Sequence, residues 1–172
     1  MNEPDLLIND VFLPNSHSLF DSLISITNWD QRIRTRKTAS FGSPYNYSNI
    51  SYESCLILDE FLPIIDRLEK HFGFRPNNCL VNYYTNGNST MGFHSDSIDE
   101  LMENTGISII SLGAERIITF QNKQDKSIKY SYLLKSGSLL FMPQKTQQDW
   151  KHGILKQPET FGRISLTFRL LV

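Results

Sequence analysis

A histidine and an aspartate separated by one residue, His94 and Asp96, follow an aromatic, strand-like run in the middle of the chain. Residues i and i+2 of a strand point to the same face, with their side chains rooted about 6–7 Å apart. An imidazole and a carboxylate placed in this way can bind one metal ion. A His-x-Asp triplet also arises often by chance, and the alternative is a pair of exposed polar residues in a turn.

A second histidine, His152, lies far along the chain in the run Trp150-Lys151-His152-Gly153. Two histidines and one carboxylate are the ligand set of facial Fe(II) centres, which keep coordination positions open for a bidentate substrate and O₂. Zinc favours a closed tetrahedron, usually with sulfur ligands. His94, Asp96 and His152 therefore predict an iron site, although His152 taken alone is also consistent with a surface loop.

The segment Arg163–Arg169 alternates strictly between polar and apolar residues. In a strand, this alternation puts Arg163, Ser165, Thr167 and Arg169 on one face, which spans about 20 Å. Two arginine side chains folded inward could then bracket a five-carbon dicarboxylate, because the planar guanidinium fork binds both oxygens of a carboxylate. The alternative is a polar face exposed to water. Two side chains that share a face of another predicted strand could add neutral hydrogen bonds: Asn82 and Tyr84.

The elements that would position these residues are mostly strands. After residue 78, short β-branched and aromatic runs recur every 8–12 residues, separated by Gly, Asn and Asp. Regular short strands with turn signals between them indicate an antiparallel sandwich or barrel. Two helical patterns, at 16–26 and 62–72, precede this region, and the segments 96–106 and 143–149 are predicted to be loops. The sequence therefore predicts a mainly β fold with flanking helices (α+β), in which the first half covers a β-rich core.

The composition is that of an ordinary globular domain. The chain has 172 residues, of which 40% are hydrophobic and 20% charged, and its formal net charge is −1. This composition excludes an intrinsically disordered chain, and the near-neutral charge restricts any contact with nucleic acid to a local patch. The one local basic cluster in the sequence is Arg32, Arg34, Arg36 and Lys37. It is interpreted either as a phosphate contact or as a solvated edge strand.

Signals for secretion or membrane insertion are absent from the sequence. The N-terminal residues are acidic and lack an apolar core after a basic stretch, and no apolar run approaches the roughly 18 residues of a membrane span. Cys55 and Cys79 lack the spacing of a zinc or redox pair and are interpreted as buried, reduced thiols. We therefore expect an intracellular protein, cytoplasmic or nuclear, with no membrane partner.

In the order and spacing of its motifs, the chain resembles the AlkB family of Fe(II)- and 2-oxoglutarate-dependent dioxygenases, which demethylate nucleic-acid bases. It is most similar to the compact repair members, and the resemblance covers roughly residues 36–172. It implies a double-stranded β-helix, or jelly roll. It also implies a division into an N-terminal extension with one helix (1–35), packed on the core, and a dioxygenase domain (36–172). Within that domain we expect a nucleotide-recognition flap at about 36–55 and the jelly-roll core at about 78–172. The motifs that carry the resemblance are Asn82-Tyr83-Tyr84, His94-Ser95-Asp96, the run from Ile107 to Phe120, GSLLFMP, Trp150-Lys151-His152 and Arg163–Arg169.

The resemblance also assigns roles to individual residues. The Fe(II) ligands that it implies are His94, Asp96 and His152. The residues that it implies for 2-oxoglutarate are Asn82, Tyr84, Arg163, Ser165 and Arg169, of which Arg163 would pair with the distal carboxylate. The substrate residues that it implies are Arg36, Tyr45, Tyr47, Ser48 and His94, with a flipped base between Tyr47 and His94.

The activity that the resemblance implies is oxidative demethylation of N-alkylated bases in DNA or RNA, and we expect the protein to be a monomer. This reaction uses Fe(II), 2-oxoglutarate and O₂ and releases formaldehyde, succinate and CO₂. Two departures bear on the substrate: Ile98 stands where repair members usually have an acidic residue, and Ser165 stands where asparagine is common. Two alternatives therefore stay open. One is a dioxygenase that hydroxylates a small molecule, a protein or a tRNA base, and the other is a non-enzymatic jelly-roll binding module.

Overall fold

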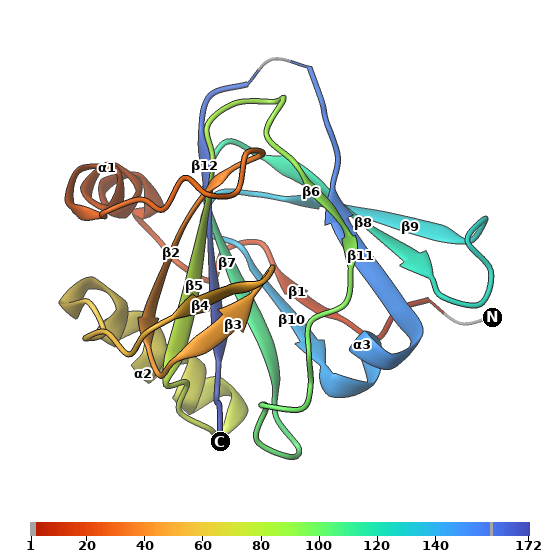
Figure 1. The fold of residues 1–172 in the computed structure, drawn as a ribbon, viewed down its shortest axis with the longest axis horizontal. Coiled ribbons are helices and arrows are strands. Elements are labelled where there is room, and N and C mark those ends of the chain that lie inside the picture. The colour runs from red at the N-terminus through yellow and green to blue at the C-terminus, as the bar shows by residue number, and fades with distance from the viewer. Residues whose placement is uncertain (1–2, 159) are drawn as a thin grey trace.

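The structure, a computed structural model, describes residues 3–158 and 160–172, and its strands form two large antiparallel sheets and a two-stranded hairpin (Figure 1). In order, the larger sheet contains β1 (Leu7–Asn9), β10 (Leu139–Pro143), β7 (Gly106–Gly113), β12 (Arg163–Arg169), β5 (Asn78–Tyr84) and β2 (Lys37–Gly42). The smaller sheet contains β6 (Met91–His94), β11 (Trp150–Ile154), β8 (Arg116–Asn122) and β9 (Lys129–Leu134). A separate hairpin is formed by β3 (Tyr45–Tyr47) and β4 (Ile50–Tyr52). This architecture confirms the predicted mainly β fold.

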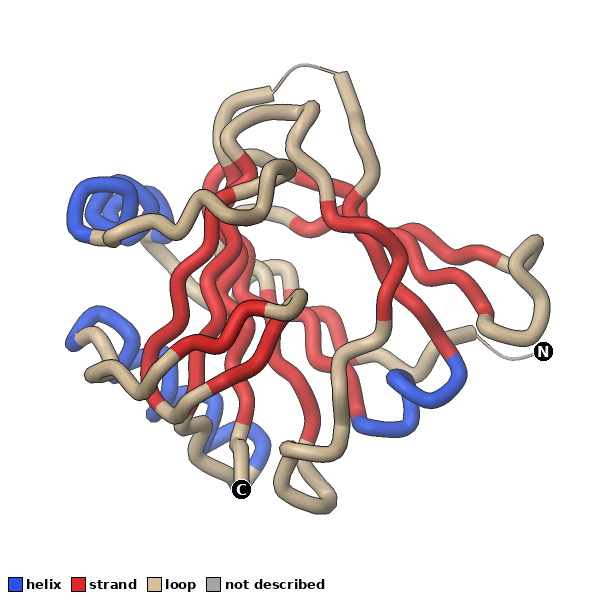
Figure 2. The backbone as a smooth tube through the Cα atoms, viewed as in Figure 1, coloured by secondary structure: helices blue, strands red, loops and turns tan. Residues whose placement is uncertain are grey.

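Two helices, α1 (Ser16–Ile26) and α2 (Leu62–Phe72), lie on the outer side of the larger sheet (Figure 2). Their bounds are those that the apolar periodicity predicts. A short 3-10 turn, Asp59–Phe61, leads into α2, and Gly73 ends this helix at φ 78°, in the left-handed region that favours glycine. The apolar stripe of α2 packs with the sheet in one core cluster.

Both faces of β12 are buried, and this explains its alternating sequence. Its apolar residues Ile164, Leu166 and Phe168 belong to the core between the larger sheet and the helices. Its polar residues turn toward the space between the two sheets, where a second apolar core packs around them. The alternative of a polar face exposed to water is therefore wrong, because Arg163 and Arg169 are each only 1% exposed.

The structure corrects two sequence predictions. Residues 144–149, predicted as part of a loop, form a short helix, α3 (Gln144–Asp149), which periodicity missed because its sequence is polar throughout. Cys79 is buried as expected, but Cys55 is exposed and follows the β3–β4 hairpin.

The N-terminal part of the chain contributes a strand to the larger sheet. Within the predicted N-terminal extension, β1 pairs with β10 and is thereby a strand of the larger sheet.

No described helix is long and apolar enough to cross a membrane.

Candidate active site

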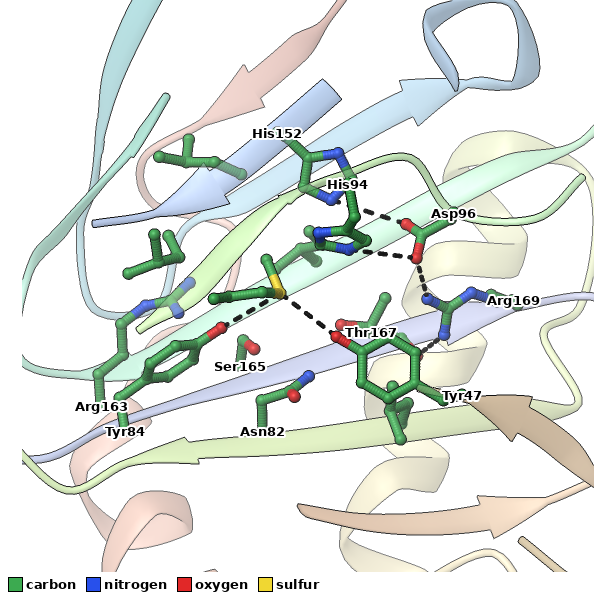
Figure 3. Close-up of a pocket in the computed structure, with 15 residues that line it drawn as sticks. Tyr47, Asn82, Tyr84, His94, Asp96, His152, Arg163, Ser165, Thr167 and Arg169 are labelled. Atoms are coloured by element: carbon green, nitrogen blue, oxygen red, sulfur yellow. Dashed lines mark hydrogen bonds and ion pairs between the residues drawn. The ribbon is translucent and has the colours of Figure 1, made fainter. Parts of the chain in front are cut away.

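Three side chains that are far apart in the sequence meet between the sheets: His94, Asp96 and His152. Their candidate ligand atoms all lie within 4.8 Å of one another. Each histidine Nε2 is 3.8 Å from a different oxygen of the Asp96 carboxylate, and Figure 3 shows the two rings and the carboxylate converging. No fourth histidine, cysteine or acidic residue among the described residues joins this cluster. The donor set fits Fe(II) bound on one face, with positions left open.

Strand pairing and one bulge bring the two histidines together. His94 of β6 pairs with His152 of β11, and two residues further along β11 the partner of Ile154 is Met91. An advance of three residues along β6 therefore matches an advance of two residues along β11. This mismatch is a β-bulge, which can change the direction of a side chain beside an active site. The bulge turns both Met91 and His94 toward the interior pocket. Asp96 lies beyond the end of β6, so the prediction that both residues of the triplet lie on one strand is wrong.

The protonation states of the cluster suit a metal ion. Burial lowers the pKa of His152 to about 4, so this imidazole is neutral at pH 7. Burial alone would raise the pKa of Asp96, but Arg169, His152 and His94 together lower it below its usual range. The Nη2 of Arg169 donates to the Asp96 carboxylate at 3.0 Å. A neutral imidazole and an ionised carboxylate are the forms that bind metal.

Gln147 of α3 hydrogen-bonds to the backbone of Asp96, and nothing in the sequence indicated this role. The backbone N–H of Asp96 donates to the Gln147 side-chain oxygen at 3.0 Å, and both residues are buried. A single glutamine in a polar run carries no signal of such a contact. Its role depends on α3, which the sequence did not predict.

Gln147→Leu should leave the buried amide of Asp96 without a partner, at a cost of about 1–3 kcal/mol in unfolding free energy. Because groups that orient a ligand affect metal affinity about 10- to 100-fold, Mn(II) binding measured by calorimetry should weaken within that range. Gln148→Leu, at an exposed neighbouring position, is the control. Equal losses in both variants would contradict the role of Gln147.

The inner pocket extends from the histidines to a buried arginine (Figure 3). Arg163 and Tyr84 lie at the far end from the metal cluster, and Arg169 lies beside Asp96. The Nη2 of Arg163 donates to Ser111 Oγ at 2.8 Å, but its Nε and Nη1 have no hydrogen-bond partner among the described residues. Burial lowers the pKa of Arg163 to about 10, which leaves it cationic at pH 7. Such an unpaired buried cation fits an anionic ligand, and the five residues predicted for 2-oxoglutarate all line this pocket: Asn82, Tyr84, Arg163, Ser165 and Arg169.

An outer pocket of about 420 Å³ adjoins the inner one. Tyr47, Met91, His94 and Asp96 line both pockets, so the metal cluster lies where the two meet. Tyr47 and His94 are in contact edge to face, with ring centroids 6.3 Å apart and an interplanar angle of 74°. A base stacked between the two rings would require them to be parallel, and in this structure they are not. The outer pocket brings together all five residues predicted for the substrate: Arg36, Tyr45, Tyr47, Ser48 and His94.

Arg36 is the residue of this set whose surroundings differ most from expectation. It is 7% exposed, and its Nε donates to Asn82 Oδ1 at 2.8 Å while its Nη2 donates to the Tyr47 hydroxyl. Its interpretation as a phosphate contact is therefore wrong. In the same predicted basic cluster, Lys37 lies over the Tyr83 ring. Arg32, which forms an ion pair with Asp30, and Arg34 are exposed and stay candidates for a phosphate contact.

The fold and the site together define a jelly-roll protein with an open three-ligand metal centre beside a pocket for an anionic ligand. The 2OG-Fe(II) oxygenase superfamily matches residues 24–169, and the chain belongs to this superfamily. The name of the superfamily implies Fe(II) and 2-oxoglutarate, used together with O₂, and the residues described above fit both groups.

Individual relatives confirm the resemblance to AlkB proteins. The chain is 31% identical over 179 residues to the alpha-ketoglutarate-dependent dioxygenase alkB homolog 3 of Bos taurus, covering 92% of this chain and 63% of that protein. It is 30% identical over 158 residues to the DNA oxidative demethylase ALKBH2 of Arabidopsis thaliana, covering 78% and 50%. The chain thus spans only about half to three fifths of the length of these curated relatives. The solved structure of OsALKBH1 has the same fold, with a TM-score of 0.74 at 18% identity, covering 98% of this chain and 99% of that one.

Proposed function

We propose that the protein is an Fe(II)- and 2-oxoglutarate-dependent dioxygenase that oxidatively demethylates N-alkylated bases in DNA or RNA. The observation that carries this proposal is the meeting of two pockets at one cluster of metal-binding side chains. The inner pocket offers an unpaired buried cation for the co-substrate, and the outer one offers aromatic walls for a base. The relatives named as alkB homolog 3 and DNA oxidative demethylase ALKBH2 support the same activity.

In this proposal the side chains bind, orient and exclude water. His94, Asp96 and His152 would hold Fe(II). The Arg163 guanidinium, whose Nε and Nη1 have no hydrogen-bond partner among the described residues, would bind the distal carboxylate of 2-oxoglutarate. The bound iron, with 2-oxoglutarate and O₂, supplies the oxidising chemistry. Arg169, which donates to Asp96, keeps this carboxylate ionised and oriented. To present a base from a duplex, the protein would extrude the nucleotide at a cost of a few kcal/mol.

A screen of methylated oligonucleotides and nucleosides tests the proposal. We expect formaldehyde and succinate to form in parallel, and only when Fe(II), 2-oxoglutarate and a methylated base are all present. Oligonucleotides carrying methyladenine, methylcytosine or no lesion should be compared at one salt concentration. Succinate formation that no methylated base stimulates would contradict demethylation and leave only the oxygenase chemistry.

Tyr47→Ala should weaken binding of methylated oligonucleotides by about 1–3 kcal/mol, the usual contribution of an aromatic side chain that stacks on a base. Tyr47 is suited to this role because it lines both pockets. The measurement is a titration by fluorescence anisotropy. Phe161→Ala, at a 66% exposed aromatic residue outside both pockets, is the control and should change nothing. Unchanged oligonucleotide binding in the Tyr47 variant would contradict its role in the substrate site.

One observation favours a second candidate function, hydroxylation of a small molecule, a protein or a tRNA base. Ile98 is half-buried against the apolar core between the sheets, so this position offers no acceptor for the exocyclic amine of a base. Asp99, the next residue, is exposed and lines neither pocket. The two candidates differ in which added compound stimulates succinate formation.

A monomeric state and a location in the cytoplasm or nucleus stay predictions from the sequence.

A further inference from the structure

Tyr45, at the start of the β3–β4 hairpin, lines the outer pocket but also belongs to the buried apolar core between the sheets. Only 4% of its surface is exposed. The Cζ atom of Arg169 is 4.5 Å from the centre of the Tyr45 ring. Because a cation close to the face of an aromatic ring is attracted to it, and most strongly when water is excluded, this contact is a strong one.

Arg169 depends on few contacts for its orientation. The residue is 1% exposed, and its Nη2 donates to Asp96 at 3.0 Å. Its Nη1 makes only a long contact of 3.5 Å to the carbonyl oxygen of Thr167, and its Nε has no hydrogen-bond partner among the described residues. The Asp96 carboxylate and the Tyr45 ring are therefore the main contacts that fix the guanidinium.

We infer that Tyr45 is a positioning residue for the metal centre rather than a residue that contacts the substrate. Its ring holds Arg169, and Arg169 holds the Asp96 carboxylate in the geometry that binds metal. The inference rests on the proposed function only for the identity of the metal and co-substrate. It differs from the role that the AlkB resemblance implies for Tyr45.

A second connection between the hairpin and the inner pocket supports this inference. The hydroxyl of Tyr47, from the same strand, accepts a hydrogen bond from Arg36, which also donates to Asn82 in the inner pocket. The hairpin that walls the outer pocket is thus joined to the inner pocket at two points. Removing the Tyr45 ring from Arg169, with the hairpin otherwise intact, should therefore change binding of the metal and co-substrate first.

Tyr45→Leu removes the aromatic ring but keeps an apolar side chain, and Tyr45→Phe keeps the ring but removes the hydroxyl. Together the two variants show whether the ring face, the apolar volume or the hydroxyl matters. Binding of Mn(II) and of 2-oxoglutarate, measured by calorimetry without any nucleic acid, is the readout. We expect Tyr45→Leu to bind Mn(II) about 10-fold more weakly, the lower end of the usual effect of groups that orient a metal ligand. Tyr45→Phe should stay within about twofold of the parent, because it keeps the ring face.

Tyr52→Leu is the matched control, because Tyr52 pairs with Tyr45 across the hairpin and its hydroxyl bonds Thr38 rather than any residue of the metal centre. It should leave Mn(II) binding within about twofold of the parent. An equal loss in Tyr52→Leu would assign the effect to hairpin stability and overturn the inference. Normal Mn(II) binding by Tyr45→Leu, with weakened oligonucleotide binding, would make Tyr45 a substrate residue and overturn it as well.

Fluorinated phenylalanines at position 45 give a test that does not depend on the leucine variant folding. Fluorination withdraws charge from the ring face and weakens its attraction for a cation while the side chain stays nearly the same size. Mn(II) affinity should fall stepwise with the number of fluorine atoms, and a flat series would overturn the inference. This readout needs no nucleic acid, so a parent protein that turned over no methylated base would contradict only the proposed function.

Discussion

Asp96→Asn should abolish 2-oxoglutarate turnover and Mn(II) binding while the protein stays folded. The amide replaces the charged ligand but keeps an oxygen that can accept the hydrogen bond from Arg169 Nη2, which is now made to Asp96 Oδ1. With two imidazoles and a neutral amide, the site no longer has the anionic carboxylate of a facial iron centre. Succinate formation, calorimetry with Mn(II) and thermal unfolding measure the three outcomes.

Asp96→Ala should lose stability as well as activity. It leaves the buried Arg169 guanidinium without its anionic partner, and breaking a buried ion pair in this way costs about 3–5 kcal/mol. Asp99→Asn, at an exposed carboxylate three residues further along the same loop, should behave like the parent. Turnover at the normal rate in Asp96→Asn would show that the cluster is not the metal site.

The identity of the clustered residues could be predicted from the sequence, but their geometry could not. Alternation in β12 predicted one polar face, and the structure places Arg163, Ser165, Thr167 and Arg169 on one pocket wall. Alternation cannot tell whether such a face meets water or a second sheet, because both give the same pattern. The register shift between β6 and β11 likewise has no signature in the sequence.

The contacts that orient the site were the least predictable part. Arg36 lies in a basic run that is typical of a phosphate contact, yet it turns inward to Asn82 and Tyr47. Neither partner is near it in the sequence, so only the pairing of β2 with β5 and the placing of the hairpin reveal the contact. The helices at 16–26 and 62–72 were predicted within their bounds because apolar spacing is a local signal.

Arg163→Lys should raise the KM for 2-oxoglutarate roughly 10- to 150-fold, which corresponds to about 1.5–3 kcal/mol for a hydrogen-bonded charged group. Lysine keeps the charge but loses the planar guanidinium, whose Nε and Nη1 in Arg163 have no hydrogen-bond partner among the described residues. Mn(II) affinity without 2-oxoglutarate should be unchanged, because Arg163 lies at the opposite end of the pocket from the metal cluster.

Arg67→Lys is the control for this exchange. Arg67 is exposed on α2, where its guanidinium lies 5.0 Å from the Phe12 ring centre, outside the inner pocket. A KM that rose equally in both variants would mean that the buried face of β12 does not bind the co-substrate. A KM that rose only in Arg163→Lys, with Mn(II) binding intact, would place the distal carboxylate at Arg163. The same result would show that Arg163 contributes to binding of 2-oxoglutarate and not of the metal, whereas Asp96→Asn removes binding of the metal.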